Sequence, residues 1–320
     1  MSEFDPRKLD FSNPQAMYET FKNVDWNDPA VIQVLLHFLR TPKEARKPHQ
    51  DLNLPVGAVE DIVVLETGYD TKLRIYIPNG QGPFPALFFY HGGGFVLGTH
   101  LQDEPFCRRI CRDAGVIVVS PDYVHAPEHP WPAAINELYE ITKWCLKNAE
   151  LYEIDPEKLA VGGSSAGGNY AAVQCVLAHE RKEFAFQYAA LVYPQLDFSI
   201  DPKDKQVPGN LVLSTEISRF FVQSYLGKER DRDLKNPVLS PAYANPEAFP
   251  TLSIFSAHFD SLAKEEQIFA NKLIDAHVEV LYKRYLNTQH GFLELPGMEA
   301  ASRDCKALIV TQLKHVFNLE

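Results

Sequence analysis

The sequence has few cysteines, and their spacing excludes a disulfide-built scaffold. It holds five, an odd number, and Cys107 and Cys111 stand four residues apart on an expected helix. That spacing suits neither a disulfide framework nor a structural zinc site. We therefore expect reduced thiols and a cytoplasmic location. The sequence also contains no visible internal repeat and no low-complexity tract.

Long apolar runs and basic runs are missing as well. The longest apolar tract near the N-terminus, residues 31–39, is interrupted by Gln33 and His37, and no basic leader precedes it. We expect neither an export signal nor a membrane span. The formal net charge is -11 at pH 7, with no Lys/Arg-rich run to offset it, which disfavours nucleic acid or an anionic membrane as a partner.

What the chain does contain is ordinary for a globular protein. Its 320 residues are 45% hydrophobic and 12% aromatic, enough to bury a sizeable core and to line an apolar pocket. From residue 62 onwards, short apolar runs alternate with helical patterns. After an antiparallel entry at 62–65 and 73–77, the expected strands are 86–90, 116–119, 159–161, 189–192, 252–255 and 278–285.

Helices are expected between these strands, at about 102–114, 133–149, 166–181, 262–276 and 299–317. Continuous apolar strands separated by helices imply the α/β class, with a mostly parallel sheet buried on both faces. Two segments break the rhythm. Residues 1 to about 50 lack strand patterns, and about 198–230 has a loop followed by a helix that carries Phe220, Phe221 and Tyr225. At helical spacing, these three aromatic residues indicate packing more than a pocket wall.

The stretch around Ser165 is organised like a nucleophile elbow. Residues 163–167 read Gly-Ser-Ser-Ala-Gly, after an apolar strand and before a helix. Small residues on both sides of the central serine permit a strained strand-to-helix turn with the hydroxyl exposed at its tip. The pattern predicts Ser165, and not Ser164, as the nucleophile.

A glycine-rich loop upstream supplies candidate oxyanion donors. Residues 91–95 read His-Gly-Gly-Gly-Phe and follow the strand 86–90 directly. Read alone, three glycines also fit a tight turn, but upstream of a serine elbow they match the oxyanion loop of esterases and lipases. The amide of Ala166, at a helix N-terminus, is the expected second half of the oxyanion hole.

An acid and a base are expected at two later strand ends. Asp260 follows the strand 252–255, although an aspartate there also suits a helix N-cap. His290 follows the strand 278–285, and the order serine, aspartate, histidine is the one expected of this architecture. The competing histidines fit less well, because they precede the serine, lie on its own helix, or lie too near Asp260: His125, His129, His179 and His258.

With these residues in place, the chain resembles the hormone-sensitive-lipase-like branch of the α/β-hydrolases over about residues 60–320. Residues 91–95 are similar to its HGGG signature, 163–169 to GDSAGGN, 260–265 to DPLxDE and 290–292 to HGF. The resemblance implies Ser165, Asp260 and His290 as a catalytic triad. It also implies that the amides of Gly93, Gly94 and Ala166 form the oxyanion hole.

The resemblance further implies one catalytic domain, residues 51–320, under a helical cap. The cap would be built from residues 1–50 and an insertion at about 198–230. The chain departs from the family at Ser164, at 123–128 (Tyr-Val-His-Ala-Pro-Glu for YRLAPE), and at Ser261 and Lys264. None of these changes removes a catalytic group, but they weaken any inference about substrate preference.

The expected activity is hydrolysis of small carboxylic esters, with short acyl chains, through an acyl-enzyme. No metal and no organic cofactor is needed for it. The triad alone leaves open an amidase, peptidase or lactonase. A binding protein such as the plant gibberellin receptors is a further alternative, but those receptors lack the triad histidine and His290 is present here. A homodimer would follow if the sheet ends at strand 278–285.

Overall fold

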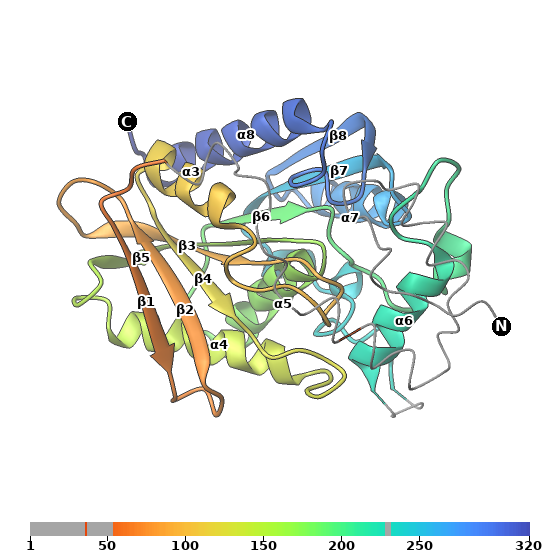
Figure 1. The fold of residues 1–320 in the computed structure, drawn as a ribbon, viewed down its shortest axis with the longest axis horizontal. Coiled ribbons are helices and arrows are strands. Elements are labelled where there is room, and N and C mark those ends of the chain that lie inside the picture. Colours follow the sequence, from red (N-terminus) through yellow and green to blue (C-terminus); the bar gives the residue numbers. More distant parts are fainter. Residues whose placement is uncertain (1–35, 37–53, 228–231) are drawn as a thin grey trace.

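The computed structural model describes residue 36 and residues 54–227 and 232–320 (Figure 1). Within them, eight strands form one sheet in the order β1-β2-β4-β3-β5-β6-β7-β8. The strands are β1 Ala58–Val64, β2 Thr71–Ile77, β3 Phe84–Tyr90, β4 Ile117–Asp122, β5 Ile154–Ser164, β6 Tyr188–Val192, β7 Thr251–Phe259 and β8 Val280–Gln289. The pairs β1/β2 and β2/β4 are antiparallel and the others are parallel, which confirms the expected class and its antiparallel entry.

Helices cover both faces of the sheet. Their bounds are α3 Glu104–Ala114, α4 Ala133–Lys147, α5 Ala166–Arg181, α6 Thr215–Leu226, α7 Ala263–Asp275 and α8 Glu299–Phe317. Figure 1 shows α3 and α8 on one face and α4 and α5 on the other, while α6 stands apart, on the side to which the arrow of β6 points. The C-terminal ends of the parallel strands therefore face the segment that carries α6.

Strand β3 shows why the central strands read as unbroken apolar runs. Phe88 and Tyr90 pack in one core cluster with residues of α4, α5 and α7. Leu87 and Phe89 alternate with them and pack in a second cluster with residues of α3 and α8. Because both faces of the sheet are covered, every position along the strand after Phe84 buries an apolar side chain.

Several strands are longer than the apolar pattern predicts, and β5 and β8 are two of them. Strand β5 begins at Ile154, five residues before the expected run, and Ile154 pairs with Phe84. Strand β8 continues past Tyr285, and Gln289 pairs with Phe259. Backbone pairing needs no apolar side chain at the end of a sheet, so hydropathy alone misses these extensions.

The two segments expected to form a cap have different outcomes. The predicted cap segment 1–50 lies outside the described residues except for Leu36, which is buried in a cluster with Val96 and Phe220. The insertion follows β6 and contains a 3₁₀ helix, η3 Pro202–Lys205, and helix α6; residues 228–231 are not described. A cap function for either segment stays a prediction.

Three further features concern the cysteines, the helices and the groups that could bind a metal. The five cysteines are all buried and free. In the part of the chain that the structure describes, no helix is long and apolar enough to cross a bilayer. The same residues contain no group of three or more His, Cys, Asp or Glu side chains placed to hold a metal ion.

Candidate active site

Ser165 lies in a strained turn between β5, which ends at Ser164, and α5, which begins at Ala166. Its backbone has φ 55° and ψ -115°, a region that residues with a Cβ rarely adopt. A Cβ on Gly163 would lie 2.3 Å from the carbonyl oxygen of Gly167. The small flanking residues are therefore what allows the turn to close, as the sequence pattern predicts.

The structure brings Ser165, His290 and Asp260 into one hydrogen-bonded row. His290 Nε2 lies 2.7 Å from the Ser165 hydroxyl, and His290 Nδ1 lies 2.7 Å from Asp260 Oδ2. A carboxylate only accepts, so Nδ1 carries the proton and Nε2 is left to accept from the serine. Asp260 is fully buried and His290 is 6% exposed, so little water competes for these bonds.

Each of these residues follows the end of a different strand. Both β7 and β8 run further than the apolar pattern predicts. Asp260 therefore comes directly after the last residue of β7, and His290 directly after the last residue of β8. The Oδ1 atom of Asp260 also accepts a hydrogen bond of 3.0 Å from the amide of Leu262, just before α7. The N-cap position of α7 is Leu262, so Asp260 is not the cap itself and its bond closes a turn before the helix. Its role in orienting His290 stays a prediction.

The glycine loop is a tight turn and also a source of unused amides. Gly93 has φ 138° and Gly94 φ 61°, and the Gly93 carbonyl accepts from the Leu97 amide at 2.9 Å. Among the described residues, the amides of Gly93, Gly94 and Ala166 donate no hydrogen bond. Three unused amides beside a serine elbow are what an oxyanion hole requires. Their role stays a prediction.

His91 and Tyr123 support this loop from behind. The Tyr123 hydroxyl donates to the His91 carbonyl at 2.6 Å, and the two rings stack with centroids 4.1 Å apart. Burial, aided by nearby His125, lowers the pKa of His91 to about 3, so the ring is neutral near pH 7. Its Nδ1 lies 2.9 Å from the Gly92 carbonyl, to which it donates.

Two of the departures from the family motifs, His125 and Ser164, lie next to the oxyanion loop. His125 packs edge-on against His91 with ring centroids 5.5 Å apart. Ser164 is buried, and a Cβ on Gly92 would lie 3.0 Å from its hydroxyl oxygen. Ser164 is therefore a packing neighbour of the loop, while His290 bonds to Ser165.

The aromatic residues of α6 divide into two groups. Phe220 and Tyr225 are buried, and Tyr225 stacks on Phe95 with centroids 4.0 Å apart, which confirms their expected packing role. Phe221 is different, because a Cβ on Gly94 would lie 2.4 Å from its ring. The ring of Phe221 therefore contacts the oxyanion loop itself.

The competing histidines lie in other surroundings. His258 stacks on Phe259 with centroids 4.2 Å apart, and its Nδ1 accepts from the amide of Asn287. His129 packs edge-on against Tyr69. His179 lies exposed in the last turn of α5, away from the N-terminal end that carries the elbow.

Sequence reasoning missed Glu137, a buried acid that binds the backbone at Val124. This residue of α4 is 1% exposed and accepts from the Thr71 hydroxyl at 2.5 Å and from the Val124 amide at 2.7 Å. Burial raises the pKa of its carboxyl to about 7 and outweighs the two hydrogen bonds, which lower it. The charge of Asp122 raises it further. No local pattern signals this site.

Glu137→Gln should remove a pH dependence of stability. The folded-state pKa of about 7 lies above the ordinary 4.5, so the stabilisation is complete below about pH 4.5 and is lost as pH rises through 7. Between pH 5 and 8, we expect the free energy of unfolding of the variant to rise by about 2–3 kcal/mol relative to wild type. Glutamine keeps both hydrogen bonds, with its NH₂ donating to Thr71.

Urea unfolding at the two pH values measures this difference. Glu140→Gln, on a more exposed face of the same helix, is the matched control and should show no such trend. A stability difference between Glu137→Gln and wild type that is the same at pH 5 and pH 8 would contradict the assignment.

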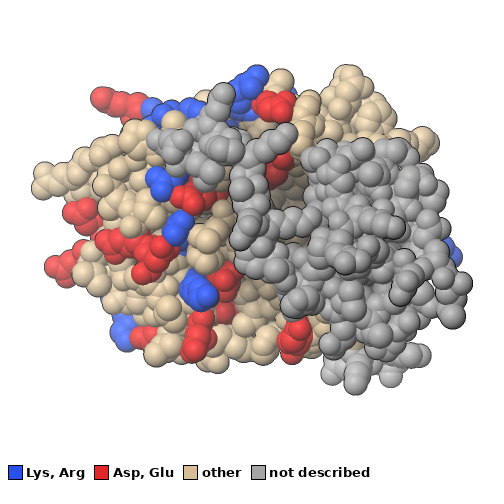
Figure 2. Space-filling view, in the orientation of Figure 1, with Lys and Arg blue, Asp and Glu red and all other residues tan. Residues whose placement is uncertain are grey.

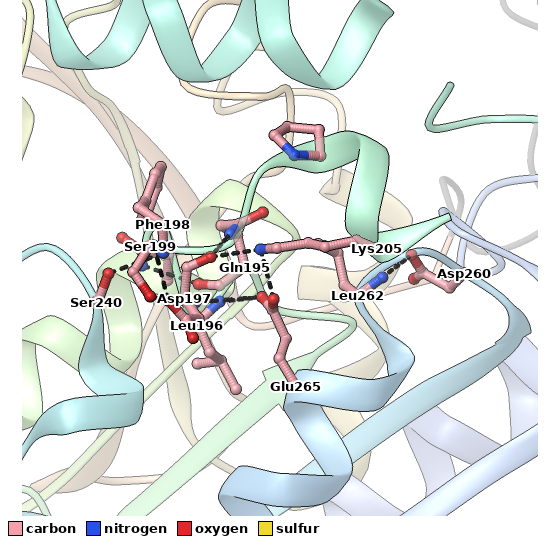
Figure 3. A network of polar contacts seen from close by, with 12 residues as sticks. Gln195, Leu196, Asp197, Phe198, Ser199, Lys205, Ser240, Asp260, Leu262 and Glu265 are labelled. Atoms are coloured by element: carbon pink, nitrogen blue, oxygen red, sulfur yellow. Dashed lines mark hydrogen bonds and ion pairs between the residues drawn. The ribbon is translucent and has the colours of Figure 1, made fainter. Parts of the chain in front are cut away.

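Sequence reasoning also missed a buried ion pair between the insertion and α7. Lys205 Nζ of η3 lies 2.5 Å from Glu265 Oε2, and the two side chains are 7% and 5% exposed. Glu265 Oε1 accepts from the Leu196 amide at 2.7 Å, and Lys205 also donates to the Asp197 carbonyl. Figure 3 shows the two charged groups pointing toward each other, with the chain after β6 alongside. Burial raises the pKa of Glu265, while Lys205 and the amide of Leu196 lower it.

Comparisons with known proteins agree with this geometry. A family model described as the alpha/beta hydrolase fold matches residues 87–294. The carboxylic ester hydrolase LipN of Mycobacterium tuberculosis (strain ATCC 25618 / H37Rv) is 36% identical over 247 residues, 74% of this chain. The chain spans 65% of LipN, slightly less than two thirds of its length. The carboxylesterase NlhH of the same organism is 29% identical over 293 residues, 90% of this chain and 89% of NlhH.

Solved structures give the same result. A hyperthermophilic esterase from the archaeon Pyrobaculum calidifontis aligns with a TM-score of 0.77 and 29% sequence identity, covering 98% of this chain and 93% of that one. The family model alone covers well over half of the chain. The chain therefore belongs to the hormone-sensitive-lipase-like family of alpha/beta hydrolases, a family of carboxylesterases and lipases.

Proposed function

We propose that the protein hydrolyses carboxylic esters through an acyl-enzyme on Ser165. The observation that carries the proposal is the unbroken row from Asp260 through His290 to Ser165, with 2.7 Å at each contact. Such a row supplies a nucleophile, a base and a group that orients the base. The relatives LipN and NlhH, named as ester hydrolases, support the same reaction class.

The reaction begins when the Ser165 oxygen attacks the ester carbonyl carbon and His290 Nε2 takes the hydroxyl proton. Asp260 holds His290 in the required tautomer and stabilises the imidazolium that forms. The amides of Gly93, Gly94 and Ala166 stabilise the negative charge on the carbonyl oxygen.

The tetrahedral intermediate then collapses. His290 gives its proton to the alkoxide oxygen as the bond to the alcohol breaks, which leaves the acyl group on Ser165. A water molecule attacks this acyl-enzyme with His290 again acting as base. His290 returns the proton to Ser165 as the acid leaves.

A substrate panel separates this activity from its alternatives. p-Nitrophenyl esters of increasing acyl length, matching p-nitroanilides and lactones would be compared under the same conditions. We expect turnover of the esters, highest with short acyl chains, and labelling of Ser165 by a fluorophosphonate. Preference for anilides or lactones would replace the ester assignment, and failure to label would favour a binding protein.

We also propose that the insertion after β6 acts as part of a cap over the site. The contact of Phe221 with Gly94 and the pair Lys205–Glu265 both join this segment to the catalytic framework. A cavity of about 10 Å³, room for one water molecule, lies between the insertion and the chain just after Asp260. The segment is thus fixed close to the triad.

Lys205→Met should destabilise this attachment by about 3 kcal/mol or more, because it leaves Glu265 buried without its ion-pair partner. The double variant Lys205→Met/Glu265→Gln should recover much of that loss, since no buried charge is then left alone. Lys203→Met, on the exposed side of η3, is the matched control. Urea unfolding measures all three. Equal destabilisation by the two lysine variants would contradict a specific attachment through Lys205.

The partners and the location remain proposals. We propose a homodimer that pairs through β8, because this strand is an edge of the sheet and Leu286 on it is 71% exposed. Light scattering on the purified protein measures its mass. We infer no nucleic-acid partner, since the net charge is -11. On the face of the molecule drawn in Figure 2, basic side chains are interspersed with acidic ones over the described residues. The buried, free cysteines support the proposed cytoplasmic location.

A further inference from the structure

We propose that Gln102 is a positioning residue for the oxyanion hole. Its side-chain amide holds the peptide group between Gly92 and Gly93, so that the Gly93 N–H is fixed toward the reacting carbonyl oxygen. The inference rests on the proposed roles of Ser165 and Gly93.

The argument begins with the geometry of one peptide group. The Gly92 carbonyl and the Gly93 amide belong to the same trans peptide, so they point in opposite directions. A donor that binds the carbonyl oxygen therefore sets the direction of the amide hydrogen. The Gly92 oxygen has two such donors, His91 Nδ1 at 2.9 Å and Gln102 Nε2 at 3.1 Å. A carbonyl oxygen has two lone pairs, so both are in use.

Gln102 reaches this oxygen from a turn that is itself fixed to the sheet. The turn lies between the glycine loop and α3. The His100 amide donates to the Asp122 carboxylate at 3.1 Å, and the Ser120 hydroxyl donates to the His100 carbonyl at 3.1 Å. Ser120 and Asp122 lie at the C-terminal end of β4. The turn is therefore held in place by β4, and Gln102 in turn holds the glycine loop in place relative to the sheet.

Gly98 allows the turn to come this close. It has φ 104°, and a Cβ on it would lie 2.5 Å from the Gly92 oxygen and 2.5 Å from His91 Nδ1. Any side chain at this position would separate the turn from the carbonyl. Gly98, which has no side chain, thus leaves the room that Gln102 needs to donate its hydrogen bond to the Gly92 carbonyl.

The contact also affects the strength of the proposed donor. Hydrogen bonds in a chain polarise one another, so donors on the Gly92 oxygen make the Gly93 N–H a better donor. Loss of one oxyanion donor in a serine hydrolase costs about 10²- to 10³-fold in kcat. His91 still holds the peptide when Gln102 is changed, so we expect a smaller loss, about tenfold.

The test is Gln102→Met, which keeps the length of the side chain and removes the donor. Active sites are titrated with a fluorophosphonate, and p-nitrophenyl acetate is the substrate. We expect kcat per titrated site to fall about tenfold while KM stays within about twofold, because the interaction matters in the transition state. Inhibition by a trifluoromethyl ketone, whose adduct carries an oxyanion, should weaken by about the same factor.

A second variant gives a signature that a merely structural residue would not show. In Gln102→Glu, the ionised carboxylate repels the Gly92 oxygen, whereas the protonated carboxyl donates its O–H to it. The ratio of variant to wild-type kcat should therefore rise as pH falls through the pKa of the introduced carboxyl. This variant also replaces Gln102→Met in the test if the methionine variant does not fold.

Gln187→Met is the matched control, because the Gln187 amide also donates to a backbone carbonyl, that of Glu157, at an exposed site. It should leave kcat and inhibition unchanged. Wild-type kcat and inhibition per titrated site in Gln102→Met, or a pH-independent ratio in Gln102→Glu, overturns the inference. Ser165→Ala, measured in parallel, separates the two levels: an active Ser165→Ala refutes the proposed function, whereas an inactive one with unaffected Gln102 variants refutes this inference alone.

Discussion

Ser165→Ala should lower kcat for p-nitrophenyl acetate by about 10⁴- to 10⁶-fold and leave the fold intact. The hydroxyl is the only part removed, and it is the group that lies 2.7 Å from His290 Nε2. Alanine has the same Cβ as serine, so the backbone strain at φ 55° is unchanged and stability should be close to wild type. Steady-state kinetics and a thermal melt on the same preparation measure both quantities.

Ser164→Ala is the matched control for this prediction. The two serines are adjacent and both belong to the elbow, but Ser164 ends β5 and packs against Gly92. We expect the variant to keep most of the activity that Ser165→Ala loses. Its fluorophosphonate labelling should match wild type in both rate and extent. An equal loss in both variants would mean that the elbow, and not one hydroxyl, is what the substitutions damage.

The elbow and the glycine loop are predictable from sequence because their constraints are local. A turn that places Ser165 at φ 55° needs small neighbours within two residues, and a loop with Gly93 at φ 138° needs a residue without a side chain. Such requirements produce a recognisable pattern in neighbouring residues of the sequence. The strand order then brings Asp260 and His290 to the same edge, so chain order was enough to select them.

Glu137, Lys205 and Gln102 were not predictable, because their roles depend on partners distant in the chain or on atoms of the backbone. Thr71 and Glu137 are 66 residues apart, and a buried acid looks the same in sequence as an exposed one. Gln102 binds a backbone carbonyl oxygen, and because every residue has one, the sequence does not show which carbonyl a side chain will bind. The C-terminal ends of β7 and β8 were missed for a related reason, since backbone pairing at the end of a strand does not depend on apolar side chains.

Asp260→Asn should lower kcat by about 10⁴-fold, because it selects the wrong tautomer of His290. The Leu262 amide donates to Oδ1 of Asp260 at 3.0 Å, and an asparagine keeps this bond only with its oxygen at that position. Its NH₂ group then replaces Oδ2 and faces His290 Nδ1. Nδ1 must accept, so the proton moves to Nε2, which can no longer take the proton of Ser165.

Glu266→Gln is the matched control, a change of the same chemical kind six residues further along. Glu266 is fully buried on α7, and burial together with the charge of Asp260 raises its pKa well above the usual range. Glutamine has the same size as glutamate, and the bonds of Asp260 to His290 and to the Leu262 amide do not involve residue 266, so kcat should stay within a few-fold of wild type. Both variants are compared by kcat per fluorophosphonate-reactive site and by thermal melts. Near wild-type turnover in Asp260→Asn would show that His290 does not need Asp260 to hold its tautomer. An equal loss in Glu266→Gln would instead attribute the effect to any change in this buried acidic pair.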